Sequence, residues 1–332
     1  MDKALIIIPY FGKLPNWFQP FLNSCNSELL YFLLITDDRT EYDYQSNFQV
    51  VYSTFSDFKI FFTKDLDREI LLETAYKLCD YKPLYGKVFS EYIKNYKYWG
   101  YCDIDIIFGD IDFFLRPFFE KGFDKLFRFG HLSIYRNSPE INHIYADRRL
   151  NFNFEFVRNT TIACNFDEVS INEIFIKTGK RYIPQQLFEN VNVNYSNFAV
   201  GNGLPLVPQL IVKLGTKLFI CELINNKINY REILYVHFMW RNNLMNIGQK
   251  SNNYLICRDG LVFFDNEKEL LRMFVKYGMP VELHEDNIYR QNVKKKARKR
   301  QIDTLVREFK TVKLLAIYNI AHYYILHKIW KY

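Results

Sequence analysis

The sequence has few of the residues that hold small or extracellular domains together. Its 332 residues include only 6 cysteines, which form no Cys-x-x-Cys pair and have no histidine at zinc-ligand spacing. Glycine (13) and proline (10) are also scarce, which excludes collagen-like and low-complexity chains. We therefore expect buried free thiols, a reducing compartment and a core that is stabilised by burial alone.

Clustered positive charge is absent from most of the chain. Residues 290–332 hold twelve basic and two acidic side chains, which leaves 32 basic against 35 acidic residues, a net charge of −3, for the rest. A protein that binds duplex nucleic acid would be expected to spread positive charge over its folded face, so no nucleic-acid partner is expected.

The N-terminal segment lacks the pattern of a secretory signal. The apolar run from Ala4 to Tyr10 is too short for a secretory signal. Its flanking residues, Met1-Asp2-Lys3 and Gly12, also differ from those of such a signal. We therefore expect a cytoplasmic protein.

Apolar runs that alternate with amphipathic segments predict an α/β fold. Strands are expected at residues 4–10, 31–36, 48–53, 98–102, 128–136, 217–222 and 233–240, and helices at 16–27, 87–95, 138–150 and 170–177. The prediction places one catalytic domain at residues 1–241 and a small β-rich appendix, with strands at 254–257 and 261–264, at residues 242–290. A basic amphipathic tail is expected at residues 291–332.

One of three Asp-x-Asp triplets follows an aromatic strand. The triplet at 65–67 lies in a charge run typical of a solvated helix face, and the triplet at 110–112 suits helix capping. Asp103 and Asp105 would lie near the core, and an extended chain would point both onto one face. Mg²⁺ or Mn²⁺ would neutralise them and also hold nucleotide phosphates. A carboxylate pair bound to backbone amides is the alternative.

Seven segments make the sequence resemble bacterial GT-A-type glycosyltransferases associated with capsule and surface polysaccharide biosynthesis. The blocks Asp80-Tyr-Lys-Pro-Leu-Tyr-Gly86 and Trp99-Gly-Tyr-Cys-Asp-Ile-Asp-Ile-Ile-Phe-Gly-Asp110 are the specific part. The other segments are Ile8-Pro-Tyr-Phe-Gly12, Ile35-Thr-Asp-Asp38, Gly130-His-Leu-Ser-Ile-Tyr-Arg-Asn137, Phe166-Asp-Glu168 and Tyr235-Val-His-Phe-Met-Trp-Arg241. The resemblance implies a Rossmann-like mixed sheet flanked by helices, and transfer of a hexose from a UDP-sugar with Mn²⁺ or Mg²⁺.

The resemblance also implies which residues hold the metal ion and the nucleotide. The implied metal ligands are Asp103, Asp105 and His237, although a lone histidine in an apolar strand is more often a core residue. The predicted nucleotide contacts are Tyr10, Gly12, Asp38, Lys82, Tyr85, Gly86 and Asp103. Cationic and aromatic groups suit the diphosphate and the uracil, and glycines allow close approach of the backbone. The alternatives are an exposed lysine and core tyrosines.

Three further residues are the predicted catalytic groups. Asp167 or Glu168 could accept the proton of the acceptor hydroxyl or bind the sugar, or else could begin the helix at residue 170. His131 would contact the donor sugar or merely cap the sheet. Met239-Trp240 stands where the family often has Gln-Lys, which leaves the role of Arg241 open.

The C-terminal segment combines a basic cluster with an apolar run. Lys294-Lys-Lys-Ala-Arg-Lys-Arg300 is followed by an amphipathic pattern and by thirteen mostly apolar residues at 314–326. A helix of that length reaches ~20 Å, less than the ~30 Å hydrocarbon core of a bilayer. The pattern predicts peripheral attachment to the inner face of the plasma membrane, with a polyprenyl-diphosphate-linked glycan as acceptor. A terminal helix packed on its own domain is the alternative.

Two other classes of function fit parts of this pattern. A metal-dependent phosphoesterase or nuclease also uses paired carboxylates, but usually needs more ligands than we can assemble near Asp103. A non-catalytic scaffold on the membrane surface would have the same fold and no metal-dependent affinity for nucleotides.

Overall fold

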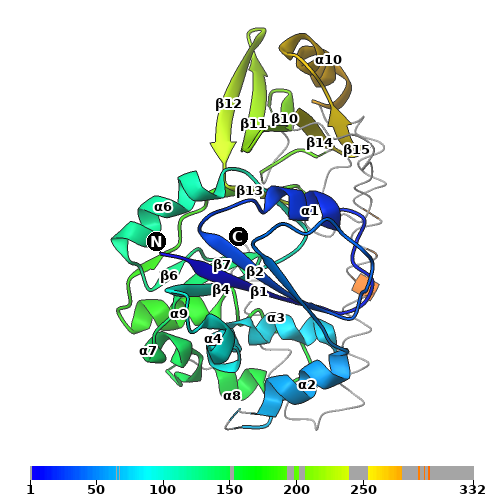
Figure 1. Cartoon of the computed structure of the whole chain (residues 1–332). Coiled ribbons are helices and arrows are strands. Elements are labelled where there is room, and N and C mark those ends of the chain that lie inside the picture. The colour runs from blue at the N-terminus through cyan, green and yellow to red at the C-terminus, as the bar shows by residue number, and fades with distance from the viewer. Residues whose placement is uncertain are drawn as a thin grey trace.

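The computed structural model describes residues 2–64, 66, 68–149, 153–192, 198–201, 206–238 and 253–278, and four single positions at 291, 295, 298 and 299. This part of the chain is a mixed α/β structure with three sheets (Figure 1). Asp65 and Asp67 of the first predicted triplet lie outside the described residues, and so does Arg241. Nearly all of the predicted tail also lies outside them.

A seven-stranded mixed sheet forms the centre of the molecule. Its strand order is β3-β2-β1-β4-β7-β6-β8. The bounds are β1(Ala4–Tyr10), β2(Leu30–Thr36), β3(Phe48–Tyr52), β4(Tyr98–Cys102), β6(Lys125–Leu126), β7(Leu132–Arg136) and β8(Tyr182–Ile183). Strands β1 to β4 run parallel to one another, and β7 runs antiparallel to β4. The mixed sheet and the strands predicted at 4–10 and 98–102 are confirmed.

Helices cover both faces of this sheet because successive side chains of its strands point to opposite sides. In β1, Leu5 and Ile7 join one apolar cluster, and Ala4, Ile6 and Ile8 join the other. The second face is covered by α1(Phe18–Ser24) and α6(Ile111–Lys121). The first face is covered by α2(Phe55–Lys64), α3(Leu78–Tyr81), η2(Lys82–Leu84), α4(Tyr85–Val88), α5(Ser90–Ile93), α7(Pro139–Asn142), η3(Ile144–Ala146), α8(Phe154–Val157) and α9(Ser170–Lys177). The short turn η1(Ala75–Lys77) directly precedes α3.

Two smaller sheets extend the fold. A three-stranded sheet joins β5(Ile106–Phe108), β13(Tyr235–His237) and β9(Phe188–Asn190). A five-stranded antiparallel sheet contains β10(Gln209–Leu214), β11(Lys217–Ile224), β12(Lys227–Ile233), β14(Asn253–Cys257) and β15(Gly260–Phe263), and α10(Glu267–Tyr277) packs on one of its faces. This sheet takes strands from both sides of residue 241, where the sequence predicted a domain boundary.

Several predicted elements are shorter or divided in the structure. The strand predicted at 128–136 begins only at Leu132, because Phe127 has a φ of 67° and the chain turns before β7. The strand predicted at 233–240 is instead the end of β12 followed by β13. The helix predicted at 138–150 is reduced to the short turns α7 and η3.

Other predictions are confirmed in detail. Asp110 is the N-cap of α6, where its side chain accepts a hydrogen bond from the backbone N–H of Phe113. All six cysteines are free thiols, and all but Cys79 are buried. In the part of the chain that the structure describes, no helix has both the length and the apolar character needed to cross a bilayer. The predicted tail helix at 314–326 lies outside these residues, so that prediction is not tested.

Candidate active site

The carboxyl ends of the central parallel strands meet at one edge of the seven-stranded sheet. Tyr10 ends β1, Asp38 follows β2, and Asp103 follows β4. Because ligands of open α/β sheets bind beyond the carboxyl ends of the strands, this edge is where a site is expected. His131 lies at the same edge, directly before β7.

Three ligand groups converge at this edge. One atom from each of Asp103, Asp105 and His237 lies within 4.8 Å of the other two. Residues 104 and 105 form a bend, so the prediction of an extended triplet was wrong. The chain bends here because it leaves the central sheet with β4 and enters the three-stranded sheet with β5.

Strand pairing brings the histidine to the aspartates. His237 pairs with Ile106 across β13 and β5, and the backbone N–H of Phe238 donates to the carbonyl of Asp105 at 2.9 Å. His237 Nε2 lies 3.4 Å from Asp105 Oδ1. Its Nδ1 is hydrogen-bonded to Asn190 Oδ1 at 2.9 Å. The amide oxygen can accept only, so Nδ1 carries a proton and Nε2 faces the carboxylates.

This donor set fits a divalent cation. Two carboxylates supply hard oxygen ligands, and a histidine whose second nitrogen is held by Asn190 is oriented as metal-ligating histidines usually are. Burial opposes protonation of His237, but the hydrogen bond and charge of Asp105, with the charge of Asp103, outweigh it and raise the pKa of the imidazole. The same negative field would attract a metal ion.

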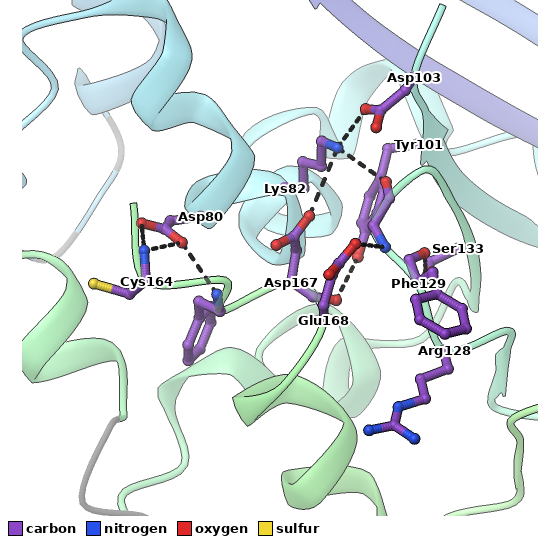
Figure 2. A network of polar contacts seen from close by, with 12 residues as sticks. Asp80, Lys82, Tyr101, Asp103, Arg128, Phe129, Ser133, Cys164, Asp167 and Glu168 are labelled. Carbon is purple, nitrogen blue, oxygen red and sulfur yellow. Dashed lines mark hydrogen bonds and ion pairs between the residues drawn. The ribbon is translucent and has the colours of Figure 1, made fainter. Parts of the chain in front are cut away.

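Lys82 links the aspartates to a second pair of carboxylates. Its ammonium group donates to Asp103 Oδ1 at 2.6 Å and to the carbonyl of Gly130 at 2.9 Å, and lies 3.6 Å from Asp167 Oδ2 (Figure 2). Burial opposes the charge on Lys82, but Asp103 and Asp167 outweigh this effect and raise the lysine pKa well above its usual value. Lys82 is thus a partly buried cation beside the aspartates and is not an exposed lysine; its contact with a nucleotide stays a prediction.

Asp167 and Glu168 face the segment that precedes β7. Burial raises the pKa of Asp167 well above its ordinary value, against the opposing charge of Lys82. Glu168 Oε1 accepts a hydrogen bond from the backbone N–H of Gly130 at 2.9 Å. A Cβ on Gly130 would lie 2.1 Å from Asp167 Oδ2, so only glycine allows this close approach. The N-cap of α9 is Val169, so neither carboxylate caps that helix.

His131 forms a wall of the site. It is 4% exposed, its Nδ1 is hydrogen-bonded to the hydroxyl of Tyr235 at 2.8 Å, and its ring lies 4.3 Å from the ring of His237. Burial, with the nearby His237 and Lys82, lowers the pKa of His131 well below its usual value. Among the described residues, Nε2 has no hydrogen-bond partner. His131 is therefore a neutral imidazole whose Nε2 is buried without a hydrogen-bond partner among the described residues.

The loop after β1 is held by the aspartates after β2. Asp37 accepts from the N–H of Gly12, which has a φ of 97°, and Asp38 accepts from the N–H of Leu14. Burial opposes ionisation of Asp38, but hydrogen bonds from Thr40 and Leu14 prevail and lower its pKa. In the structure this carboxylate fixes the loop, whereas the sequence predicted a nucleotide contact.

Tyr10 is half-buried beside this loop. Burial, followed by the charges of Asp105 and Asp38, raises the pKa of its hydroxyl. The hydroxyl of Tyr10 is therefore close enough to feel the charge of Asp105, one of the predicted metal ligands.

Two predicted nucleotide contacts are core residues instead. Tyr85 is 1% exposed and packs edge-on against Phe62, Phe89 and Tyr101, so its ring cannot stack on a base. A Cβ on Gly86 would lie 2.5 Å from the indole of Trp99. The absence of a side chain at Gly86 makes room for this indole and not for a ligand.

The sequence interpretation assigned no role to Lys77, Asp80 or Asn190. The first two form a buried ion pair behind Asp167, and Asn190 orients His237. Asp80 opens the block at 80–86 that was singled out for its resemblance, so a signal for it existed. For Asn190 the sequence carries no signal, because only the pairing of β9 with β13 brings it to the histidine.

The chain was also compared with known proteins. The family described as a family of unknown function (DUF6625) matches residues 6–267, a span that includes every residue of the site. No curated protein matches the chain.

Proposed function

The chain belongs to the DUF6625 family, whose function is unknown, and we propose that it is a metal-dependent glycosyltransferase of the GT-A type. In this proposal it moves a hexose from a UDP-sugar to a bacterial glycan that is linked to a polyprenyl diphosphate. The observation that carries the proposal is the convergence of Asp103, Asp105 and His237, with Lys82 beside them, at the carboxyl edge of the sheet.

The proposed ligands would hold Mn²⁺ or Mg²⁺ through two carboxylates and one imidazole. When bound, the ion supplies charge stabilisation to the diphosphate as the sugar leaves. Asn190 orients His237 for this role, and the ring of His131 packs against the same imidazole. The buried Nε2 of His131 could reach the predicted donor sugar only if the ring or its neighbours moved.

Lys82 would bind the diphosphate directly. Its ammonium already lies between Asp103 and Asp167, so a small rotation about its side-chain bonds would turn the charge toward a phosphate while Asp167 keeps it partly balanced. The leaving UDP gains negative charge during transfer, and a cation in a partly buried site stabilises that charge more than it would in water.

Glu168 is the proposed proton acceptor. Transfer breaks the bond between the anomeric carbon and the diphosphate oxygen and forms a bond to the acceptor oxygen, whose proton must be removed. Asp167 is 4% exposed and faces Lys82, so it has little access to an acceptor hydroxyl. Glu168 is half-buried and uses Oε1 to hold Gly130, which leaves Oε2 to take the proton.

The test combines product analysis with substitution of the carboxylates. Purified protein is incubated with UDP-sugars and Mn²⁺, and the release of UDP is measured. We expect UDP release that is lost in Asp103→Ala and in Asp105→Ala. Asp110→Ala is the control, because this aspartate belongs to the neighbouring triplet and caps α6. No UDP from any donor, or full activity of the folded Asp103→Ala and Asp105→Ala variants, would contradict the proposal.

Calorimetry separates the rival classes of function. UDP should bind tightly only with Mn²⁺ present, and a scaffold would show no such dependence. A phosphoesterase would cleave the nucleotide at a phosphate and release UMP or inorganic phosphate in place of UDP.

The C-terminal segment at 291–332 is proposed to hold the enzyme at a membrane surface. Its basic cluster and apolar run are the sequence features that support this role. A membrane-bound acceptor would explain why a domain with an α/β core carries such a segment.

A further inference from the structure

A buried ion pair lies directly behind the predicted catalytic carboxylates. Lys77 ends η1 and Asp80 lies in α3, and their side chains are 1% and 0% exposed, with 2.8 Å between Nζ and Oδ2. Burying two charges is costly, and their mutual attraction repays this cost only if further hydrogen bonds satisfy the remaining atoms. The atoms that satisfy this pair therefore show what it holds in place.

The partners are main-chain groups of one irregular segment, residues 162–166. Lys77 Nζ donates to the carbonyl of Ile162 at 2.5 Å. The Asp80 carboxylate accepts from the N–H of Cys164 at 2.8 Å and from the N–H of Phe166 at 3.1 Å (Figure 2). These buried backbone groups lie outside any helix or strand. The ion pair therefore supplies the hydrogen-bond partners that regular secondary structure would otherwise supply.

The segment leads directly into the site. Phe166 is 0% exposed, and Asp167 and Glu168 are the next two residues. A hydrogen bond that fixes the N–H of Phe166 therefore fixes the point from which both carboxylates project. Asn165 adopts a φ of 51°, so the chain reverses here and needs outside support to keep this path.

The same short helical run also reaches the opposite side of the site. Lys82 follows Asp80 by two residues, and its ammonium binds Asp103 and the carbonyl of Gly130. One run of chain thus holds the main chain behind Asp167 through one side chain and the end of β4 through another. The position of Asp167 relative to Asp103 therefore depends on the hydrogen bonds of Asp80 as well as on those of Lys82.

We propose that Asp80, supported by Lys77, is a positioning residue that sets the location of Asp167 and Glu168 relative to Asp103. It has no contact with substrate in this role and acts only through the 162–166 segment. The expected effect on catalysis rests on the proposed glycosyltransferase function. The expected effect on the position of the 162–166 segment does not depend on that function.

The first experiment therefore measures hydrogen exchange in the full chain, without substrate. Asp80→Asn alone would leave Lys77 as a buried unpaired charge, so the variant Lys77→Met/Asp80→Asn removes both charges together. We expect exchange at the amides of Cys164 and Phe166 to be faster by about tenfold or more, because each loses a charged acceptor. Wild-type protection of residues 160–169 in the folded double variant would overturn the proposal.

Asp112 offers a matched control. Its carboxylate accepts hydrogen bonds from Ser27 Oγ and from the N–H of Glu28 at 2.9 Å, so it too holds an irregular segment, but on α6 and away from the site. Asp112→Asn should speed exchange near residue 28 and leave residues 160–169 unchanged. Faster exchange at 160–169 in this variant as well would point to general loosening and count against a specific role for Asp80.

The second experiment measures steady-state kinetics of UDP release. A misplacement of about 1 Å can cost ~10²-fold in rate, so kcat of the double variant should fall by about that factor. KM for the donor should change by less than about threefold, because Asp103, Asp105 and His237 lie on other segments and Lys82 keeps its own hydrogen bonds to Asp103 and to the carbonyl of Gly130. A fall in kcat no larger than that of Asp112→Asn would overturn the positioning role. If the wild-type chain releases no UDP, the proposed function fails, and hydrogen exchange still decides whether Asp80 holds the segment.

Discussion

Gly130→Ala is the substitution whose consequence can be worked out most directly from the structure. A Cβ at this position would lie 2.1 Å from Asp167 Oδ2 and 3.0 Å from its Cγ, whereas real Cβ contacts are essentially never under 3.0 Å. The carboxylate must therefore move by about 1 Å. Its surroundings resist the movement, because Asp167 is 4% exposed and faces Lys82.

Gly130→Ala should lower both the stability of the fold and the catalytic rate. Inserting a methyl group into a packed site typically costs about 1–3 kcal/mol in the free energy of unfolding, and a shift of about 1 Å in a catalytic group can cost ~10²-fold in kcat. Denaturant titration and UDP release measure these two quantities. Backbone strain does not confuse the result, because the φ of Gly130 lies outside the region that disfavours side chains.

A double-mutant cycle with Asp167→Ala identifies the clash. Once the Asp167 carboxylate is removed, Gly130→Ala should cost less than about 0.5 kcal/mol, since the closest remaining contact is Glu168 Cγ at 3.1 Å. Equal costs in the two backgrounds would refute the reasoning, as would a Gly130→Ala variant as stable as the wild type.

Three further outcomes are expected. Lys213 is 6% exposed and its pKa is lowered by burial to about 8, so between that pH and 10.5 this lysine is protonated only in the unfolded chain, and its own contribution to folding stability rises with pH by up to about 1.4 kcal/mol per pH unit. Lys213→Met should remove this rise, and an unchanged pH profile in denaturant titrations would count against it. Gly86→Ala should lose about 1–3 kcal/mol through contact with Trp99 and yet keep the affinity of the folded protein for UDP, which calorimetry can check; weaker binding would restore a nucleotide role for Gly86. Replacing two basic residues of the 294–300 cluster with Gln should weaken binding to anionic vesicles by about 30-fold, from ~1 kcal/mol each, and equal partition in a sedimentation assay would exclude the proposed attachment.

The local sequence determined much of the central sheet. The continuous apolar runs at 4–10 and 98–102 match β1 and β4 residue for residue, because a strand that is buried on both faces needs such a run. Asp110 was predicted as a helix cap from its immediate neighbours, since capping is a local interaction. The position of Asp103 at the end of an aromatic strand likewise pointed to the edge where ligand groups gather.

Tertiary structure alone decided which predicted residues share a site. Tyr85 and Gly86 sit in a block that resembles a nucleotide-binding segment, yet their environment is set by Trp99 and by packing across the sheet. The extent of the five-stranded sheet, which spans residue 241, depends on the pairing of β10 with β14 across a long interval. Local periodicity carries no information about such pairings.

Asp80 shows the physical reason most plainly. Its carboxylate binds the amides of residues that follow it by 84 and 86 positions, and nothing near it in the chain indicates this partner. The sequence by itself determined that a charged residue opens the block that contains Lys82. Only the folded chain decided that this charge is buried, paired with Lys77 and turned toward the segment that carries Asp167, because hydrogen bonds between distant segments form only once the core has brought them together.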